Sequence, residues 1–389
     1  MENLFFELLQ LALGIREGLS RRLTVEEWRK VYEEAKRQSL IGVMFCAVER
    51  MPQEWRPEAG LLMEWIGWTA RIEELNLLMD REAARLTSLF EAEGLRTAIL
   101  KGQANARLYK SATHDLKETT GDTVRLANRR QPGDIDIWVD GGREKVVETL
   151  VKTGLVSKRE DVAEGFCPGK AMTAYHHVHL PMNENGITVE VHFRPSSGNF
   201  NKITNRRLQR YLSETMDEWR TEKGFNVPSR RFALVMQLAH IQRHFFDGGI
   251  GMRQLVDYYF LLKESTVEAD VTETLLRRLG LRRIAGAVMW VIQEVFCLDR
   301  QLMLCEPDER RGKWLLRVVM EGGNFGRYKK AGLWKSFFIA RLEQIRLLVF
   351  DFWEGLWSIG AFLKSFVERI PSRIKYRTLS LNRVVHENK

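Results

Sequence analysis

The spacing of apolar residues changes twice along the chain, and each change predicts a different kind of structure. Across residues 72–93 the apolar side chains recur at helical spacing, and Gly94 then supplies a helix stop. Thr24 followed by Glu27 has the form of a capping box, so we expect another helix to begin there. Residues 1–93 are therefore predicted to form an N-terminal helical segment.

Short apolar runs and shorter helices follow this segment. The run 97–100 ends at Lys101-Gly102 and predicts a buried strand, and a short helix is expected over 103–109. Residues 134–140 alternate polar and apolar side chains, as a half-buried strand does. A helix over 143–153 comes next. Together these elements predict a small α/β unit.

A hairpin and a second set of helices complete the pattern. Two alternating runs, 175–180 and 187–193, flank an Asn-Glu-Asn-Gly turn. From about residue 205 the chain returns to helical spacing, most clearly over 230–246. This order predicts an α+β fold. Its four expected parts are an N-terminal helical segment (1–93), an α/β core (94–204), a C-terminal helical domain (205–330) and a basic helical tail (331–389).

Three carboxylates stand out because of the strand faces that carry them. Asp134 and Asp136 share one face of the first alternating strand, and burial of the opposite, apolar face is expected to leave them on an open face. Glu190 and His192 share a face of the second strand, so Glu190 approaches the aspartates if the strands are neighbours. Side chains two residues apart on a strand are separated by about 6.5 Å, which suits Mg²⁺ bound between them. A solvated strand face is the alternative for so short a motif.

Composition narrows the class of protein without identifying its partner. The formal net charge of +9 favours anionic partners such as nucleotides, nucleic acid or anionic lipid, although a basic soluble protein has the same charge. The four cysteines form no CxxC pair, which argues against a zinc knuckle or a thioredoxin-like site. No basic signal-peptide start is present, and Asp351 and Glu354 interrupt the apolar stretch near the C-terminus, so we expect a cytoplasmic protein. The basic stretch 364–383 either contacts an anionic surface or packs on the body.

Three motifs of the core together resemble a known superfamily; they are Leu100-Lys101-Gly102, Gly133-Asp134-Ile135-Asp136-Ile137 and Val189-Glu190-Val191-His192. They are similar to motifs of the DNA polymerase β-like nucleotidyltransferases, and more narrowly to the bacterial group often labelled "nucleotidyltransferase family protein". The resemblance covers roughly residues 20–265. It implies an α+β fold with a small mixed-sheet nucleotidyltransferase core between N- and C-terminal helical segments.

The resemblance also implies a role for the matched residues. Asp134 and Asp136 would bind Mg²⁺, or Mn²⁺ in its place. Glu190 would be a third metal ligand or the base for an acceptor hydroxyl. The turn after the first strand would bring backbone N–H groups to the triphosphate, so Gly102 and its neighbours are expected to bind nucleotide.

Two departures from the superfamily pattern concern this turn and the loop after it. The turn is Lys101-Gly102-Gln103, which lacks the serine that often contacts phosphate; Lys101 either compensates or is structural. The gap between Gly102 and Asp134 is long for the superfamily. The additional residues form the polar loop 111–133. This loop either becomes ordered when substrate binds or, as we prefer, is an insertion.

Histidines gather on the predicted hairpin. His176, His177 and His179 accompany His192, and imidazole ligands suit zinc. Adjacent residues of a strand point to opposite faces, which argues against joint ligation by His176 and His177. We therefore prefer His192 as a substrate contact or carboxylate partner.

The following helical half offers positive groups for the triphosphate. Arg243, His244 and Arg253 are expected to bind nucleotide together with Lys101, because guanidinium groups donate paired hydrogen bonds to phosphate. The alternative is that these arginines pair with acids such as Asp247 and Asp257.

The leading hypothesis is thus an Mg²⁺-dependent enzyme that transfers a nucleoside monophosphate from a nucleoside triphosphate to an acceptor hydroxyl. The acceptor is a small molecule, a sugar, an RNA end or a protein. The competing hypothesis is a catalytically silent module that keeps the fold and binds nucleotide or a partner. The intact carboxylates favour the enzyme, whereas the missing serine favours the silent module.

Overall fold

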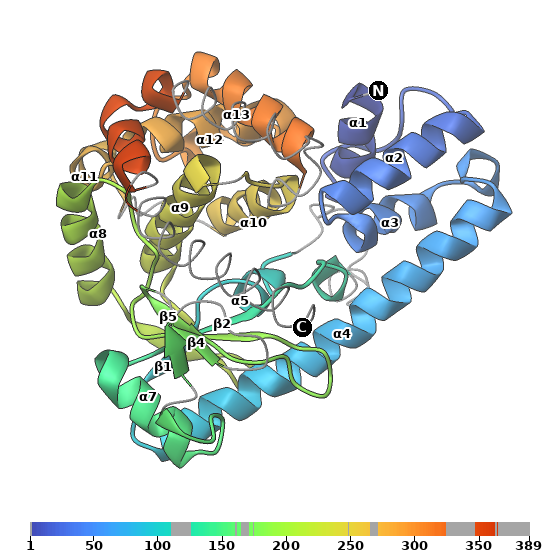
Figure 1. Cartoon of the computed structure of the whole chain (residues 1–389). Helices are drawn as coiled ribbons and strands as arrows, with labels where there is room; N and C mark the ends of the chain where they lie inside the picture. The colour runs from blue at the N-terminus through green and yellow to red at the C-terminus, as the bar shows by residue number, and fades with distance from the viewer. Residues whose placement is uncertain are drawn as a thin grey trace, which may run out of the picture.

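The fold is a small mixed sheet with helices on both of its faces (Figure 1). The computed structural model describes residues 2–109, 126–159, 162–164, 171–173, 175–247, 249–264, 271–323, 347–361 and 364. The predicted α+β class with helical flanks is confirmed. Most of the predicted basic tail and residues 111–125 of the polar loop lie outside the described residues.

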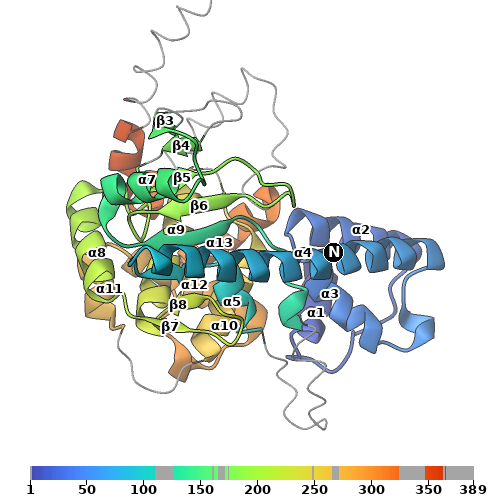
Figure 2. The ribbon, with the colours of Figure 1, turned by 90° about the horizontal axis from the view of Figure 1, so that it is seen from below.

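The N-terminal helices are α1 (Glu2–Ala12), α2 (Val25–Arg37), α3 (Ile41–Arg50) and α4 (Ala59–Ala92), with a 3₁₀ turn at Gln53–Trp55. The predicted capping box starts α2, because the Thr24 hydroxyl accepts the Glu27 N–H and the Glu27 carboxylate accepts the Thr24 N–H. Helix α4 runs from the other N-terminal helices to the sheet (Figures 1 and 2). It ends before Gly94, whose φ of +73° suits glycine.

Within the described residues, six strands form the sheet in the order β1-β2-β6-β5-β4-β3. Strand β1 is antiparallel to β2, β2 is parallel to β6, and β6 is antiparallel to β5, so the sheet is mixed. The short helix α5 (Gln103–Ala106) follows β1, and α7 (Gly142–Lys152) follows β2. The strands are β1 (Thr97–Ile99), β2 (Ile135–Val139), β3 (Val162–Glu164), β4 (Ala171–Thr173), β5 (His177–His179) and β6 (Val189–His192).

The predicted hairpin corresponds to β5 and β6. Its turn is held by Asn183, whose side-chain oxygen accepts the N–H groups of Asn185 and Ile187 at 3.0 and 2.9 Å. Four other strands did not appear in the sequence pattern: β3, β4, and the pair β7 (Glu218–Arg220) and β8 (Asn226–Pro228). The prediction of helix alone after residue 205 is therefore wrong over 218–228, because three-residue strands are too short to show alternation.

The C-terminal helices cover one face of the sheet, opposite to the face that packs on α4 and α7 (Figure 1). They are α8 (Lys202–Glu214), α9 (Arg230–Asp247), α10 (Met252–Lys263), α11 (Glu273–Leu279), α12 (Arg282–Phe296) and α13 (Glu309–Gly322), with a 3₁₀ turn at Arg300–Leu302 and helical residues at 347–350 and 352–361. The last of these is attached to the start of α8, where the buried Glu354 carboxylate accepts the backbone N–H groups of Phe200 and Asn201.

Two apolar clusters lie on the two faces of the sheet. One cluster joins the apolar face of β2 to α7 and the C-terminal half of α4; among its members are Ile135, Ile137, Val139, Val146, Leu150, Ala83, Leu86 and Phe90. The other face carries Trp138 and Ala98, which belong to the larger cluster with α9, α10 and α12. The face that carries Asp136 is therefore covered by helices, and the prediction of an open face is wrong for this residue. In the described part of the chain, no helix combines the length and the apolar character needed to cross a membrane.

Candidate functional site

Two carboxylates meet where β2 and β6 pair. The parallel register places Asp136 opposite Glu190 and Trp138 opposite His192. Potential metal-binding atoms of Asp136, Glu190 and His192 all lie within 4.8 Å of one another. The strand pairing thus brings together residues that are far apart in the sequence.

Asp136 is the most buried member, with 2% of its surface exposed. Its Oδ1 atom lies 3.1 Å from the Lys101 ammonium and 3.0 Å from His192 Nε2. Burial by itself raises the pKa of Asp136, but the positive charge of Lys101 and the His192 hydrogen bond outweigh it and leave the pKa below its ordinary value. The carboxylate is therefore ionised and already pairs with a cation.

Glu190 is the link between the two aspartates. One of its oxygens lies 3.3 Å from His192 Nε2 and 3.6 Å from His177 Nδ1. Burial raises the pKa of Glu190, but the His192 hydrogen bond and the charge of Lys101 bring this pKa well below its usual value. Glu190 also forms a second group with Asp134 and His179, whose potential ligand atoms again lie within 4.8 Å of one another.

Asp134 differs from Asp136 in its surroundings. It is exposed at the start of β2, where its carboxylate accepts a hydrogen bond from the Thr188 hydroxyl. Thr188 is a contact that sequence reasoning did not single out. Thr188 sits directly before β6, and the pairing of β6 with β2 is the only signal that places it beside Asp134.

The histidines of the hairpin converge instead of dividing between two faces. His176 precedes β5 and does not follow the strand alternation, so its Nε2 atom lies 3.0 Å from His177 Nδ1. The ring centroids of His176 and His177 each lie 5.1 Å from that of His192. Burial lowers the pKa of His176 to about 2 and that of His177 to about 4, so both rings are neutral at neutral pH. The expectation that these two side chains point apart is wrong.

The turn after β1 contributes one side chain directly. Lys101 contacts Asp136, and Gly102 adopts a φ of +64° at the start of α5, where a Cβ would lie 3.6 Å from the Asp134 carbonyl oxygen. Gln103, also expected at the nucleotide, is buried and donates its amide to Asp80 on α4 at 2.6 Å. The structure therefore brings Lys101 and Gly102 to the carboxylates but engages Gln103 elsewhere.

Helix α9 brings two histidines toward this group. The His240 and His244 rings contact each other, with centroids 4.2 Å apart. Burial, followed by the positive charge of Lys101, lowers the pKa of both, that of His244 to about 4. Arg243 differs: it pairs with Asp247 at 3.2 Å and lies over the Phe200 ring at 3.7 Å. His244 is thus near the site, whereas Arg243 is engaged as the alternative hypothesis expected.

Arg253 on α10 holds the turn that leads into β2. Only 6% of its surface is exposed, and its Nη1 atom donates to the carbonyls of Gln131 and Pro132 at 2.8 and 3.1 Å. Asp257, the acid considered as its partner, instead accepts two hydrogen bonds from Arg130, both at 2.7 Å. The described contacts of Arg253 therefore position the backbone before Asp134.

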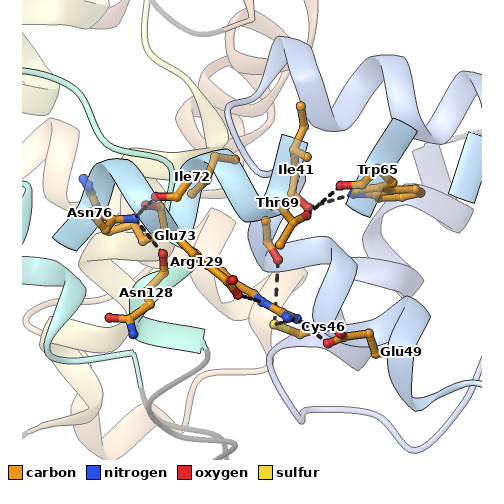
Figure 3. Close-up of polar contacts among 12 residues, drawn as sticks. Ile41, Cys46, Glu49, Trp65, Thr69, Ile72, Glu73, Asn76, Asn128 and Arg129 are labelled. Atoms are coloured by element: carbon orange, nitrogen blue, oxygen red, sulfur yellow. Dashed lines mark hydrogen bonds and ion pairs between the residues drawn. The ribbon is translucent and has the colours of Figure 1, made fainter. Parts of the chain in front are cut away.

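Residues 128–130, near the C-terminal end of the polar loop, are held against α3 and α4 by hydrogen bonds and ion pairs. Arg129 pairs with Glu49 on α3 and with Glu73 on α4, the latter at 2.6 Å (Figure 3). The Asn76 amide on α4 donates to the carbonyls of Asn128 and Arg130 at 2.6 and 2.9 Å. No pattern in the sequence distinguishes these buried arginines from solvated ones, because their partners are supplied by distant helices.

Comparison with known families places this geometry in context. Residues 24–114 and 122–297, more than half of the 389-residue chain, match a family described as "Uncharacterised nucleotidyltransferase". The matched ranges include the Lys101-Gly102 turn and both strands that carry the carboxylates. No curated protein and no solved structure matched the chain. Since the match covers most of the sequence and includes the clustered carboxylates, the chain belongs to this uncharacterised family of nucleotidyltransferases.

Proposed function

We propose that the protein is a metal-dependent nucleotidyltransferase of the polymerase β-like kind. In this proposal Asp134, Asp136 and Glu190 bind Mg²⁺, or Mn²⁺ in its place, beside the phosphates of a nucleoside triphosphate. The observation that carries it is the pairing of β2 with β6, which brings ligand atoms of Asp136, Glu190 and His192 within 4.8 Å of one another. Family membership supports nucleotidyl transfer in general.

The residues present fit a hard divalent cation. Carboxylate oxygens are the ligands that Mg²⁺ prefers, and it completes its coordination with substrate phosphates and water. Asp136 is buried and ionised, which is the form of a carboxylate that binds a metal, and in this structure the Lys101 ammonium compensates its charge. When bound, the metal supplies positive charge that stabilises the attacking and leaving oxygens of phosphoryl transfer.

The protein side chains have separable tasks. His192 contacts both Asp136 and Glu190 and therefore fixes the relative positions of their carboxylates. Glu190 is ionised at neutral pH, as a group that accepts the proton of an acceptor hydroxyl must be. Lys101 brings a positive charge to the end of β1, and the Gly102 turn leaves room for a phosphate to approach the backbone. His244 is proposed as a further nucleotide contact from α9.

The acceptor is proposed to carry a hydroxyl group, on a small molecule, a sugar, an RNA end or a protein. The direct test is to incubate the protein with each labelled nucleoside triphosphate, Mg²⁺ and a cell extract, and to follow pyrophosphate release and labelled products. We expect pyrophosphate release that stops when Mg²⁺ is chelated. Nucleotide binding without any release would instead favour the silent module.

Matched variants make this test specific to the site. Asp134→Asn and Glu190→Gln are expected to abolish release, because each removes one carboxylate charge from the proposed metal site. Asp140→Asn is the control, since Asp140 is an exposed aspartate at the opposite end of β2 that accepts the N–H of Gly141. Full activity of Asp134→Asn, or equal losses in all three variants, would contradict the proposal.

A further inference from the structure

The carboxylate site adjoins a second group of ligand atoms that is rich in nitrogen. His176, His177 and His192 each offer a ring nitrogen, and these atoms lie within 4.8 Å of one another. Glu190 adds an oxygen, 3.6 Å from His177 Nδ1 and 3.3 Å from His192 Nε2. The three imidazoles therefore surround a common position, and the Glu190 carboxylate lies beside two of them.

The spacing of these atoms matches metal coordination. Zinc binds imidazole nitrogens at about 2.0–2.1 Å, so the ligands of a tetrahedral ion are separated by about 3.3 Å. The separations here are 3.0 Å between His176 Nε2 and His177 Nδ1, and 3.6 Å between Glu190 and His177 Nδ1. Both separations lie within about 0.3 Å of that spacing.

A further feature of His192 points to a ligand. His192 has 5% of its surface exposed, and among the described residues its Nδ1 atom is buried without a hydrogen-bond partner. A buried polar atom without a partner is uncommon in a folded protein and calls for an explanation.

We propose that His176, His177, His192 and Glu190 form a subsite for a divalent transition metal such as Zn²⁺ or Co²⁺, next to the carboxylates that bind Mg²⁺. Imidazole ligands favour such ions, whereas Mg²⁺ favours oxygen ligands. The subsite deepens the proposed function, because Glu190 belongs to both groups and connects the two cations. A hydrogen-bonded histidine cluster without metal is the competing explanation.

Cobalt binding to the full-length protein tests the subsite without relying on activity. The chelator-treated protein is titrated with Co²⁺ in the presence of a large excess of Mg²⁺, and the bound metal is measured by its visible absorption and by elemental analysis. We expect about one equivalent of Co²⁺ that Mg²⁺ does not displace. Absence of Co²⁺ absorption, or displacement by Mg²⁺ at millimolar concentration, would overturn the proposal.

Variants locate the ion within the hairpin. His176→Ala and His177→Ala are expected to weaken Co²⁺ binding at least tenfold, since each removes a ligand. His179→Ala is the control: His179 is two residues from His177 on β5, but its ligand atom lies with Asp134 and Glu190. An equal loss in His179→Ala would assign the ion to that other group and contradict the proposal. The wild-type competition decides the case even where a variant fails to fold.

The two proposals fail separately. Retained Co²⁺ without Mg²⁺-dependent pyrophosphate release supports the subsite and contradicts the proposed enzyme. Pyrophosphate release by a protein that binds no Co²⁺ supports the enzyme and contradicts the subsite.

Discussion

Replacing Arg253 with alanine is expected to lower the free energy of unfolding by about 3 kcal/mol. The guanidinium is buried and donates to the carbonyls of Gln131 and Pro132. Two hydrogen bonds from a charged donor contribute about 3–6 kcal/mol together. Part of this is offset, because burial and the charge of Arg130 lower the pKa of Arg253 to about 10, which shows that the charged form is disfavoured there.

Urea unfolding of the Arg253→Ala and Arg243→Ala variants tests this estimate. Arg243 is the matched control because it pairs with the exposed Asp247 and lies over Phe200, contacts that contribute about 1 kcal/mol. The expected order is a larger loss for Arg253→Ala, with reduced protection of the 131–134 backbone in hydrogen exchange. Equal losses, or unchanged exchange in that turn, would refute the role of Arg253 in positioning the start of β2.

Three further outcomes follow from individual contacts. Asp136→Asn is expected to lower the free energy of unfolding of the metal-free protein by about 2 kcal/mol, because it leaves the Lys101 ammonium without its buried partner. Asp134→Asn is expected to lower it by less than about 0.5 kcal/mol. Equal melting temperatures of the two variants would contradict this. Burial raises the pKa of Glu354 from 4.5 to about 7, so its contribution to stability is complete below pH 4.5 and is lost as the pH rises through 7. Melting curves across that range should show the decline in the wild type and not in Glu354→Gln. Thr24→Ala removes the capping box of α2 and should lower the free energy of unfolding by about 1 kcal/mol, and an unchanged denaturation midpoint would argue against it.

The elements that were predicted from the sequence share strong local signals. The period-two alternation around Asp136 and Glu190 indicated two strands with their carboxylates on one face each, and β2 and β6 carry that pattern. The hairpin turn and the stop at Gly94 depend on residues whose backbone preferences act within a few positions. Such features follow from the chain itself and need no distant partner.

Features that depend on distant partners were not predictable. Alternation assigns Asp136 to a face but says nothing of what covers that face, and α9 and α10 follow about a hundred residues later in the sequence. Arg253 and Arg243 look alike in the sequence, and only the fold decides that one is buried against the 131–133 backbone and the other pairs with Asp247. His176 lies one residue before β5, a boundary that periodicity cannot locate to the residue.

The strand order also determines when the residues of the carboxylate cluster can come together during synthesis of the chain. Strand β2 can pair with β1 early, but its other neighbour is β6, a parallel partner that arrives only after α7 and three more strands have been synthesised. Contacts between such distant segments form slowly, because a long loop must close before they contribute any stability. A ribosome-bound chain that ends before β6 therefore carries the two aspartates without Glu190 or His192. Until β6 is made, such a chain cannot assemble the cluster that Asp136 forms with Glu190 and His192.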